Sequence, residues 1–441
     1  MATPDAEVVP FTFGQLSLWR SDQEVPAEKR PEWHFSRAWP VPAGTTLAVV
    51  RAALRAMAER HESLRTTVDA RPARPLQVIW TPSAAAFPVA VAAARDGLTE
   101  QVAAAAAVAL AGRPFDLSAE PGWRAEVLPD AAGQPRYVCV AFHHIVVDQW
   151  ALGLLDTEFA ALVADPDPAA AATRMPPASR PRVLAAAQQS ADGAARGAAA
   201  TRYWRRLLAK YPPVPGPATM SFSGGSGRLR VVVESASLGA AFGRVAAASN
   251  VSGQAAVLAV TLEAIAEFGV ELDEPLILMA ANRSDPDTRA LVSTQNQAAV
   301  LAIPERGPDF TAYAGAVEWA SYAAYRYGCY DFDEFTALVR ELRGTALRYD
   351  YFFNCAVGGG DEPVADWSGP APVEIAVGPA PQSTGPRLDV RVYRAPSLTL
   401  DIRAASSLLD AADLAALARW MYGRVHTLAA AQPVPAGPLF T

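Results

Sequence analysis

The stretch from Tyr137 to Leu155, YVCVAFHHIVVDQWALGLL, constrains the fold of this chain more than any other segment. Its first part, residues 137–142, is short, apolar and rich in β-branched and aromatic residues, which predicts a buried β-strand. Beyond Asp148 the apolar residues recur at helical spacing. The adjacent pair His143 and His144 is therefore predicted to lie at a strand-to-helix junction, where a rigid strand can hold a reactive side chain beside a cleft.

The histidine pair leaves two interpretations open. Neighbouring side chains on a strand point to opposite faces, so only one imidazole can face a given cavity. That imidazole could accept a proton from an amine or a hydroxyl, because the unperturbed pKa of histidine is about 6.5. Asp148 could orient a ring or close the turn through an ion pair, and the whole group could equally be structural. No metal site is predicted, since adjacent strand residues diverge and no further His or Cys lies nearby at ligand spacing.

The length of the chain predicts two lobes, because 441 residues exceed what one hydrophobic core usually supports. Residues 165–182 are rich in proline and alanine and predict a linker, which places the lobes at 1–175 and 176–441. Strand and helix patterns alternate in both lobes and indicate an α/β class with mixed or antiparallel sheets. Near the C-terminus, residues 388–393 and 398–403 alternate cleanly and predict a β-hairpin.

The composition argues against several classes of protein. The formal net charge of −7, without a basic tract that contains aromatic residues, gives no reason to expect nucleic-acid binding. The three cysteines, Cys139, Cys329 and Cys355, are far apart and odd in number, which indicates a reducing compartment. The N-terminal residues lack the regions of a signal peptide, and the alanine-rich segments are too short or too polar to span a bilayer. A soluble cytoplasmic protein is therefore predicted.

Five short motifs carry a resemblance to a known family. They are QLSLW at residues 15–19, RHESLRT at 60–66, HHIVVD at 143–148, YW at 203–204 and ANR at 281–283. With these motifs the chain resembles the condensation domains of nonribosomal peptide synthetases, in the superfamily of chloramphenicol acetyltransferase. HHIVVD matches the family signature HHxxxDG, and the order and spacing of the five motifs also agree.

The resemblance implies two chloramphenicol acetyltransferase-like lobes in a V-shaped pseudo-dimer with a tunnel at their interface. In the family, a carrier-protein phosphopantetheine arm enters from each side, one with an acyl or aminoacyl thioester and the other with an amine. His144 is then expected to face the tunnel and to contact the attacking amine. His143 is expected to be structural, and Asp148 is expected to pair with Arg283.

The activity implied by the resemblance is that of a stand-alone acyl or aminoacyl transferase. It would form an amide, or an ester, from a carrier-bound thioester and an amine or hydroxyl acceptor in nonribosomal peptide or natural-product biosynthesis. No bound cofactor, metal or nucleotide is implied, because the phosphopantetheine arm belongs to a partner carrier protein. No adenylation or carrier domain fits into the chain, so the enzyme is expected to work in trans.

Four residues near the motifs could tune or support the site. Gln149 replaces the glycine that usually follows the signature aspartate, so its side chain could narrow the tunnel or hydrogen-bond an unusual substrate. Trp150 stands where condensation domains often have a tryptophan. Asn282 could offer a polar contact to the tunnel or serve its own turn. Arg65 is interpreted as a scaffold or surface residue.

Two alternative functions remain open at this point. The segment YGCYDF at residues 327–332 departs from the family's HQDxPF-like motif. Together with Gln149, this favours an unusual substrate pair or a non-catalytic module that recruits a tailoring enzyme or a carrier protein. Epimerisation of a carrier-bound aminoacyl group is a third hypothesis, but the residues after Asp148 fit condensation better.

Overall fold

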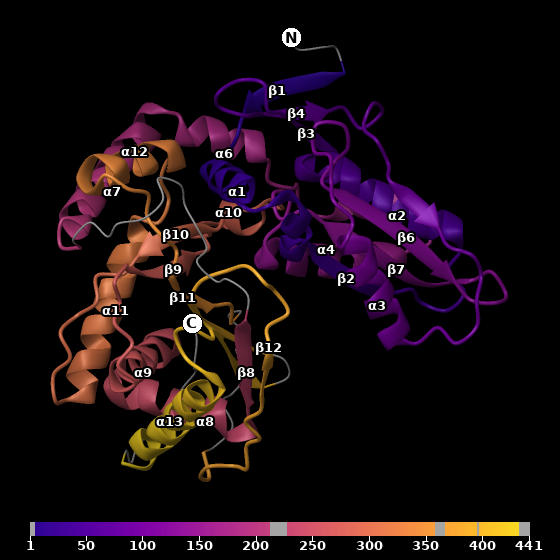
Figure 1. The fold of residues 1–441 in the computed structure, drawn as a ribbon. Coiled ribbons are helices and arrows are strands. Elements are labelled where there is room, and N and C mark those ends of the chain that lie inside the picture. The colour runs from indigo at the N-terminus through magenta and orange to yellow at the C-terminus, as the bar shows by residue number, and fades with distance from the viewer. Residues whose placement is uncertain (1–4, 212–226, 358–366, 395–396, 432–441) are drawn as a thin grey trace. The chain divides into compact units, whose positions relative to one another are not determined.

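The structure is a computed structural model that describes residues 5–211, 227–357, 367–394 and 397–431. Its contacts divide the chain into two compact units. Unit 1 comprises Met1–Ala198 and Ala281–Gln297, and unit 2 comprises Ala199–Ala280 and Ala298–Thr441. Both units combine helices and strands, as predicted for an α/β protein (Figure 1).

Unit 1 contains two sheets. A four-stranded sheet has the order β2 (Phe35–Pro40), β7 (Pro135–Phe142), β6 (Trp123–Pro129) and β5 (Val89–Val91). A three-stranded sheet has the order β1 (Ala6–Pro10), β4 (Leu76–Trp80) and β3 (Thr66–Asp69). The helices are α1 (Phe13–Glu24), α2 (Leu47–Arg60), α3 (Glu100–Ala111), α4 (Gln149–Val163), α5 (Pro168–Arg174), α6 (Pro181–Gln188), the first part of α7 (Ala191–Leu208) and α10 (Pro286–Arg289), with 3₁₀ turns at Ala27–Trp33 and Glu62–Arg65.

Strand β7 contains the predicted buried strand and lies between β2 and β6, antiparallel to both. Residues 138–142 are at most 1% exposed. The alanine-rich helix α3 packs on β2 and β7 (Figure 1), where the small side chains of Ala103 and Ala107 allow a close approach to Cys139. Burial raises the pKa of the Cys139 thiol to about 11, so this cysteine is a small core residue. The packing makes β7 a rigid support for the histidines that follow it.

Residues 165–182, which the composition predicts to be a linker, contain helix α5 and the start of α6. A proline opens each of these helices, where its missing N–H costs no hydrogen bond. Helix α6 is tied to unit 1, because Gln188 Oε1 accepts the Phe13 N–H at 2.8 Å and Arg182 Nε lies 3.1 Å from Glu62 Oε1. Unit 1 therefore extends to Ala198, beyond the boundary expected near residue 175.

The segment Ala281–Gln297 also belongs to unit 1, although it follows a strand of unit 2 in the chain. Gly14 allows this segment to pack closely against α1, because a β-carbon at position 14 would lie 2.6 Å from Gln295 Cα. Arg283 is therefore in the same unit as the His143-His144 turn. Composition and spacing placed Arg283 in the second lobe, since they carry no information on which unit a loop packs against.

Unit 2 is built on a seven-stranded mixed sheet. The strand order is β10 (Gln297–Val300), β9 (Leu276–Ala280), β11 (Tyr351–Cys355), β13 (Leu388–Arg394), β14 (Leu398–Ala405), β8 (Arg228–Glu234) and β12 (Val377–Pro379). The helices are the rest of α7, α8 (Ala236–Ser249), α9 (Gly253–Glu267), α11 (Phe310–Arg326), α12 (Phe332–Arg343) and α13 (Ala411–Ala430). β13 and β14 form the predicted antiparallel hairpin, whose turn at residues 395 and 396 lies outside the described residues.

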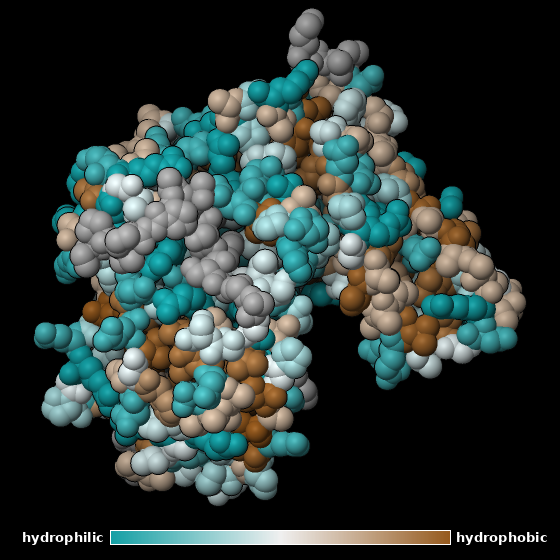
Figure 2. All heavy atoms as spheres, in the orientation of Figure 1, coloured by the Kyte–Doolittle hydropathy of each residue, from teal (hydrophilic) through white to brown (hydrophobic). Residues whose placement is uncertain are grey.

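On the face shown in Figure 2, hydrophilic and hydrophobic residues are interspersed. In the part of the chain that the structure describes, no single helix is long and apolar enough to cross a bilayer. Helices α8 and α9 meet the test only as a pair, and they are bent by 99° at the break between them.

Candidate active site

The residues after β7 form a tight turn that ends at helix α4. The His143 N–H donates to the Gly122 carbonyl at 2.8 Å, and the Val146 N–H donates to the His143 carbonyl at 3.1 Å. Gly122 lets the turn lie against β6, because a β-carbon there would be 2.9 Å from Val146 Cγ1. Asp148 caps α4, since its Oδ1 accepts the Ala151 N–H at 2.8 Å. Backbone hydrogen bonds and one helix cap thus build the junction.

His144 is held in one tautomer by the same turn. Its Nδ1 lies 2.8 Å from the Val147 carbonyl oxygen, and a carbonyl can only accept, so Nδ1–H is the donor. In the neutral ring, Nε2 is then an unprotonated acceptor. Phe35 packs edge-on against the ring with a centroid distance of 4.8 Å, and Thr294 Oγ1 lies 3.5 Å from Nδ1. Among the described residues, none makes a hydrogen bond to Nε2.

The environment keeps His144 uncharged. Burial lowers its pKa below the ordinary value of 6.5, although backbone hydrogen bonds and the charge of Asp148 oppose this effect. At neutral pH the ring is therefore in the form that can accept a proton.

Asp148 is buried and paired with Arg283, whose Nη2 donates to both carboxylate oxygens at 2.8 Å. Each of the two side chains is only 1% exposed. The guanidinium also donates to three backbone carbonyls, those of Thr288 at 2.7 Å, Leu291 at 2.8 Å and Ser293 at 2.9 Å. Asp148 therefore fixes the start of α4 to the segment 281–297, a structural task that leaves it no free oxygen for a proton relay.

His143 is buried, and its ring serves the turn. Nδ1 accepts the Ile145 N–H at 3.1 Å, so the proton of the neutral ring is on Nε2, which lies 3.9 Å from Asp22 Oδ1. His34 and Phe115 pack against the ring. Burial lowers the pKa of His143 well below 6.5 and raises the pKa of Asp22 to about 6. These contacts support the structural role expected for His143.

The three residues expected to tune the substrate lie on the same turn or next to Arg283. Gln149 is exposed at the first position of α4, and its φ is not positive, so its backbone does not need a glycine. Trp150 is 43% exposed, and its Nε1 donates to the Arg289 carbonyl at 2.9 Å. Asn282 has a φ of 54°, and its Nδ2 donates to the Gln295 carbonyl at 3.0 Å. The Asn282 amide therefore joins the two ends of the segment 281–297.

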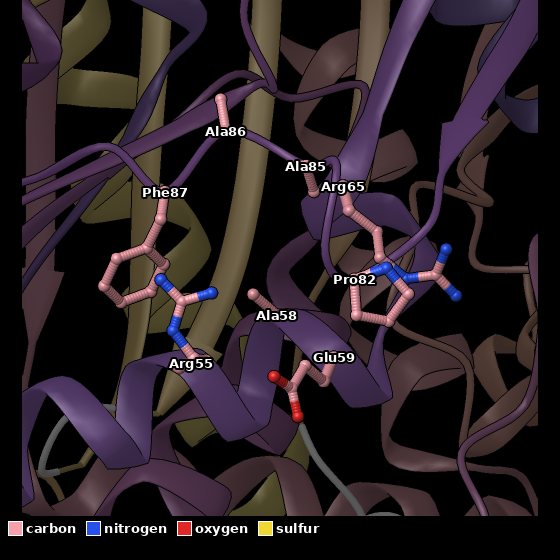
Figure 3. Close-up of a pocket in the computed structure, with 8 residues that line it drawn as sticks. All are labelled: Arg55, Ala58, Glu59, Arg65, Pro82, Ala85, Ala86 and Phe87. Carbon is pink, nitrogen blue, oxygen red and sulfur yellow. The ribbon is translucent and has the colours of Figure 1, made fainter. Parts of the chain in front are cut away.

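Arg65 and its neighbours line a shallow hollow beside α2. Arg65 Nη1 donates to the Trp80 carbonyl, and burial lowers the pKa of its guanidinium. Figure 3 shows Arg55 against the Phe87 ring on one side of the hollow and Arg65 on the other, with Arg55 Cζ 4.2 Å from the ring centroid. His144 is not one of the lining residues, so the hollow is separate from the candidate active site.

Two other motifs that carry the resemblance are parts of the scaffold. Arg60 Nε and His61 Nε2 both bond the Glu158 carboxylate of α4, at 2.8 and 2.9 Å. Trp204 is 1% exposed in the core of unit 2. These motifs hold helices in place and do not supply reactive groups.

Sequence reasoning missed the residues that complete the site from the segment 281–297. The Gln295 N–H donates to Asp148 Oδ2 at 3.1 Å, and Thr294 lies beside His144. The available signal was the polar run STQNQ at residues 293–297, in which Ser293 and Thr294 are fully buried. Buried polar residues need fixed partners, and here the partners belong to the His143-His144 turn.

Comparison with known proteins gives a consistent result. A family model described as "Condensation domain" matches residues 8–348, which is more than half of the 441 residues. Phosphinothricin tripeptide synthetase PhsC of Streptomyces viridochromogenes is 29% identical over 295 residues, which cover 64% of this chain and 26% of that protein. The chain thus spans about a quarter of the length of this relative.

Two solved structures resemble the fold. One is a condensation domain that mediates chain release from the enacyloxin polyketide synthase. Its TM-score is 0.74 at 23% identity, and the match covers 98% of this chain and 85% of that chain. The condensation domain of the Monacolin K polyketide synthase MokA has a TM-score of 0.73 at 14% identity, covering 98% and 100%. The predicted two-lobed, chloramphenicol acetyltransferase-like α/β fold is thereby confirmed. The V shape and the tunnel stay predictions.

Proposed function

The chain belongs to the condensation-domain family, and from this we propose that it transfers an acyl or aminoacyl group from a carrier-protein thioester to an amine or hydroxyl acceptor. Condensation domains generally form amide bonds or transfer acyl groups from phosphopantetheine-tethered donors. The observation that carries the proposal for this chain is the state of His144. Its ring is neutral, with Nδ1 fixed on the Val147 carbonyl and Nε2 left as an acceptor.

The chemistry follows from that nitrogen. His144 Nε2 accepts a hydrogen bond from the N–H or O–H of the attacking amine or hydroxyl. This contact directs the lone pair of the amine or hydroxyl at the thioester carbonyl carbon. The new C–N or C–O bond forms, the C–S bond breaks, and the phosphopantetheine thiol leaves. The proton lost by the acceptor passes to the departing sulfur, so atoms and charge balance. The hydrogen bond to His144 Nε2 serves both possible roles, removing the proton of the amine or hydroxyl and positioning that group for attack.

The surrounding residues hold the imidazole in place. Asp148 and Arg283 join α4 to the segment 281–297, and His143 fixes the turn through the Ile145 N–H. Gln149, Trp150 and Asn282 are proposed to shape the approach of the acceptor. The donor arm belongs to an acyl or peptidyl carrier protein, and the trans mode of action stays a prediction.

The direct test is incubation with candidate acyl-loaded carrier proteins and free nucleophiles, followed by intact-mass spectrometry of the carrier. We expect enzyme-dependent loss of the acyl mass and appearance of the acylated acceptor. Failure to unload any loaded carrier, across amine and hydroxyl acceptors, would contradict the proposal.

The pH dependence provides a second prediction. A base with a lowered pKa stays neutral as the pH falls below 6.5, so its activity is lost only at a still lower pH. With a hydroxyl acceptor, which does not titrate in this range, the acid limb of the kcat/KM profile should therefore lie below 6.5. A profile measured from about pH 5 to about pH 8 decides this. An acid limb above 6.5 would show that His144 is not the neutral base.

The substitution Gln149→Gly distinguishes the effect of the side chain at position 149 from the effect of the backbone conformation there. Because the backbone there is already helical, we expect the free energy of unfolding to change by about 1 kcal/mol or less. Removal of the side chain should shift the acceptor preference toward bulkier acceptors by about tenfold. Urea denaturation and competition between two acceptors measure the two effects. An unchanged preference would remove Gln149 from the tuning residues.

A second candidate function is a non-catalytic module that recruits a tailoring enzyme or a carrier protein. It is favoured by Gln149 in place of glycine and by the divergent segment at residues 327–332. The two candidates differ in one outcome. Binding to a partner oxygenase, with no product from any carrier-bound pair, would favour the module over the transferase.

A further inference from the structure

The seven-stranded sheet of unit 2 has two chemically different faces. On one face, the alternate residues of β8, β13 and β14 are apolar and buried beneath α8 and α13 (Figure 1). On the other face, the strand register places Arg230 opposite Arg403, and Arg403 opposite Asp389. This arginine face consists of Arg228, Arg230, Arg391 and Arg403 together with Asp389 and Asp401. Glu234, also on this side of β8, is exposed at the far end of the strand.

Both aspartates of the arginine face are already paired. Arg230 donates to the two oxygens of Asp401 at 2.9 and 3.0 Å, and Arg403 donates to the same carboxylate at 3.1 and 2.7 Å. Asp389 Oδ2 accepts from Arg391 Nε at 2.8 Å. Three of the four guanidinium groups therefore pair with the two carboxylates, and the face has an excess of positive charge.

Arg228 is the arginine without a carboxylate in hydrogen-bond contact. Its Nη1 donates to the Thr384 carbonyl at 2.9 Å, while Nε and Nη2 have no hydrogen-bond partner among the described residues. The residue is 5% exposed, and burial lowers the pKa of its guanidinium, with Asp389 opposing this effect. Unpaired donors of a buried cation are costly to stability. The retained charge therefore points to a ligand.

The two unpaired donors have the geometry of an anion site. Nε–H and Nη2–H lie on one edge of the planar guanidinium, and that edge matches two oxygens of a carboxylate or a phosphate. Gly385 lies over the group, since a β-carbon there would be 2.6 Å from Arg228 Nη1. Beside Arg230, the neighbouring strand residue is Gly378, and no atom lies within 4 Å of the position a β-carbon would take there. Both glycines keep side chains off the arginine face.

We propose that the arginine face of unit 2 binds a small oxyanion, a carboxylate or phosphate group, through the Nε and Nη2 edge of Arg228. The Thr384 carbonyl and Gly385 lie against the Nη1 side of the same guanidinium. The site uses residues of unit 2 alone. Anion binding at this site does not depend on the proposed transferase activity.

Isothermal titration calorimetry of the full chain at constant ionic strength tests the proposal, with inorganic phosphate and succinate as separate probes. We expect one equivalent of at least one probe to bind the wild-type protein. Arg228→Met should bind it at least about tenfold more weakly, and so should Arg228→Lys, which keeps the charge but lacks the two-donor edge. Arg71→Met, which removes an exposed arginine of unit 1, should bind like the wild type.

Melting temperatures without added anion separate a ligand site from a structural one. Because Arg228→Met removes unpaired buried donors, it should melt at the same or a higher temperature than the wild type. Binding of phosphate alone or of succinate alone identifies the group that the site prefers. The proposal is overturned if neither probe binds the wild type, if the Arg228 variants bind equally well, or if Arg228→Met melts at a clearly lower temperature.

Discussion

The substitution His144→Ala should reduce acyl transfer by about 10² to 10⁴-fold, the usual contribution of a general acid or base. The alanine variant keeps the turn, because the bonds that build it come from the backbone of His143, Gly122 and Val146. The variant loses the acceptor nitrogen Nε2 together with the Nδ1–H bond to the Val147 carbonyl. The measurement is the single-turnover rate of carrier unloading, followed by intact-mass spectrometry.

The matched control is His426→Ala. His426 is also a buried histidine whose Nδ1 bonds a backbone carbonyl, that of Tyr422 at 2.8 Å, but it belongs to unit 2. Its substitution should change stability and leave turnover close to the wild-type value. If His144→Ala folds normally and its rate stays within about threefold of the wild type, the catalytic assignment is wrong.

Asp148→Ala should destabilise unit 1 by about 3 to 5 kcal/mol, because it leaves the Arg283 guanidinium buried without its carboxylate. The Ala151 and Gln295 N–H groups lose their acceptor as well. Turnover should fall together with stability, since the start of α4 is then no longer fixed to the segment 281–297. Urea denaturation measures the loss, and hydrogen exchange of the α4 amides assigns it to unit 1.

Glu274→Ala is the matched control for this pair. Glu274 and Arg343 form a buried ion pair of unit 2, with Arg343 Nη1 2.7 Å from Glu274 Oε2 and each side chain 1% exposed. Its loss should destabilise the protein by a similar amount and leave the exchange of the α4 amides unchanged. A loss of less than about 1 kcal/mol in Asp148→Ala would show that the Asp148–Arg283 pair does not hold the turn.

Local features of this fold could be predicted from the sequence because local pattern determines them. Strand β7 follows from its run of apolar and β-branched residues, and the β13–β14 hairpin follows from alternation on both sides of a short turn. The cap at Asp148 lies where the helical spacing begins. In each case the residues that interact are close in sequence, so a single stretch contains the information.

The rest of the site depends on contacts between distant residues and on backbone atoms. Thr294 and Gln295 meet His144 and Asp148 across about 150 positions of chain, and no periodicity reports such a contact. The tautomer of His144 is set by the Val147 carbonyl, a group that every residue type carries. Likewise, the charged residues of β8, β13 and β14 are visible in the sequence, but only the register shows that two aspartates lie among four arginines on one face.

The proposed chemistry depends on one atom, Nε2 of His144. The chain has only five histidines, so nitrogen-15 NMR of histidine-labelled protein, assigned with His144→Ala, can determine the protonation of this ring. We expect a neutral His144 at pH 7 with the proton on Nδ1 and a bare Nε2. A charged ring at pH 7, or a neutral ring with its proton on Nε2, would contradict the proposed role.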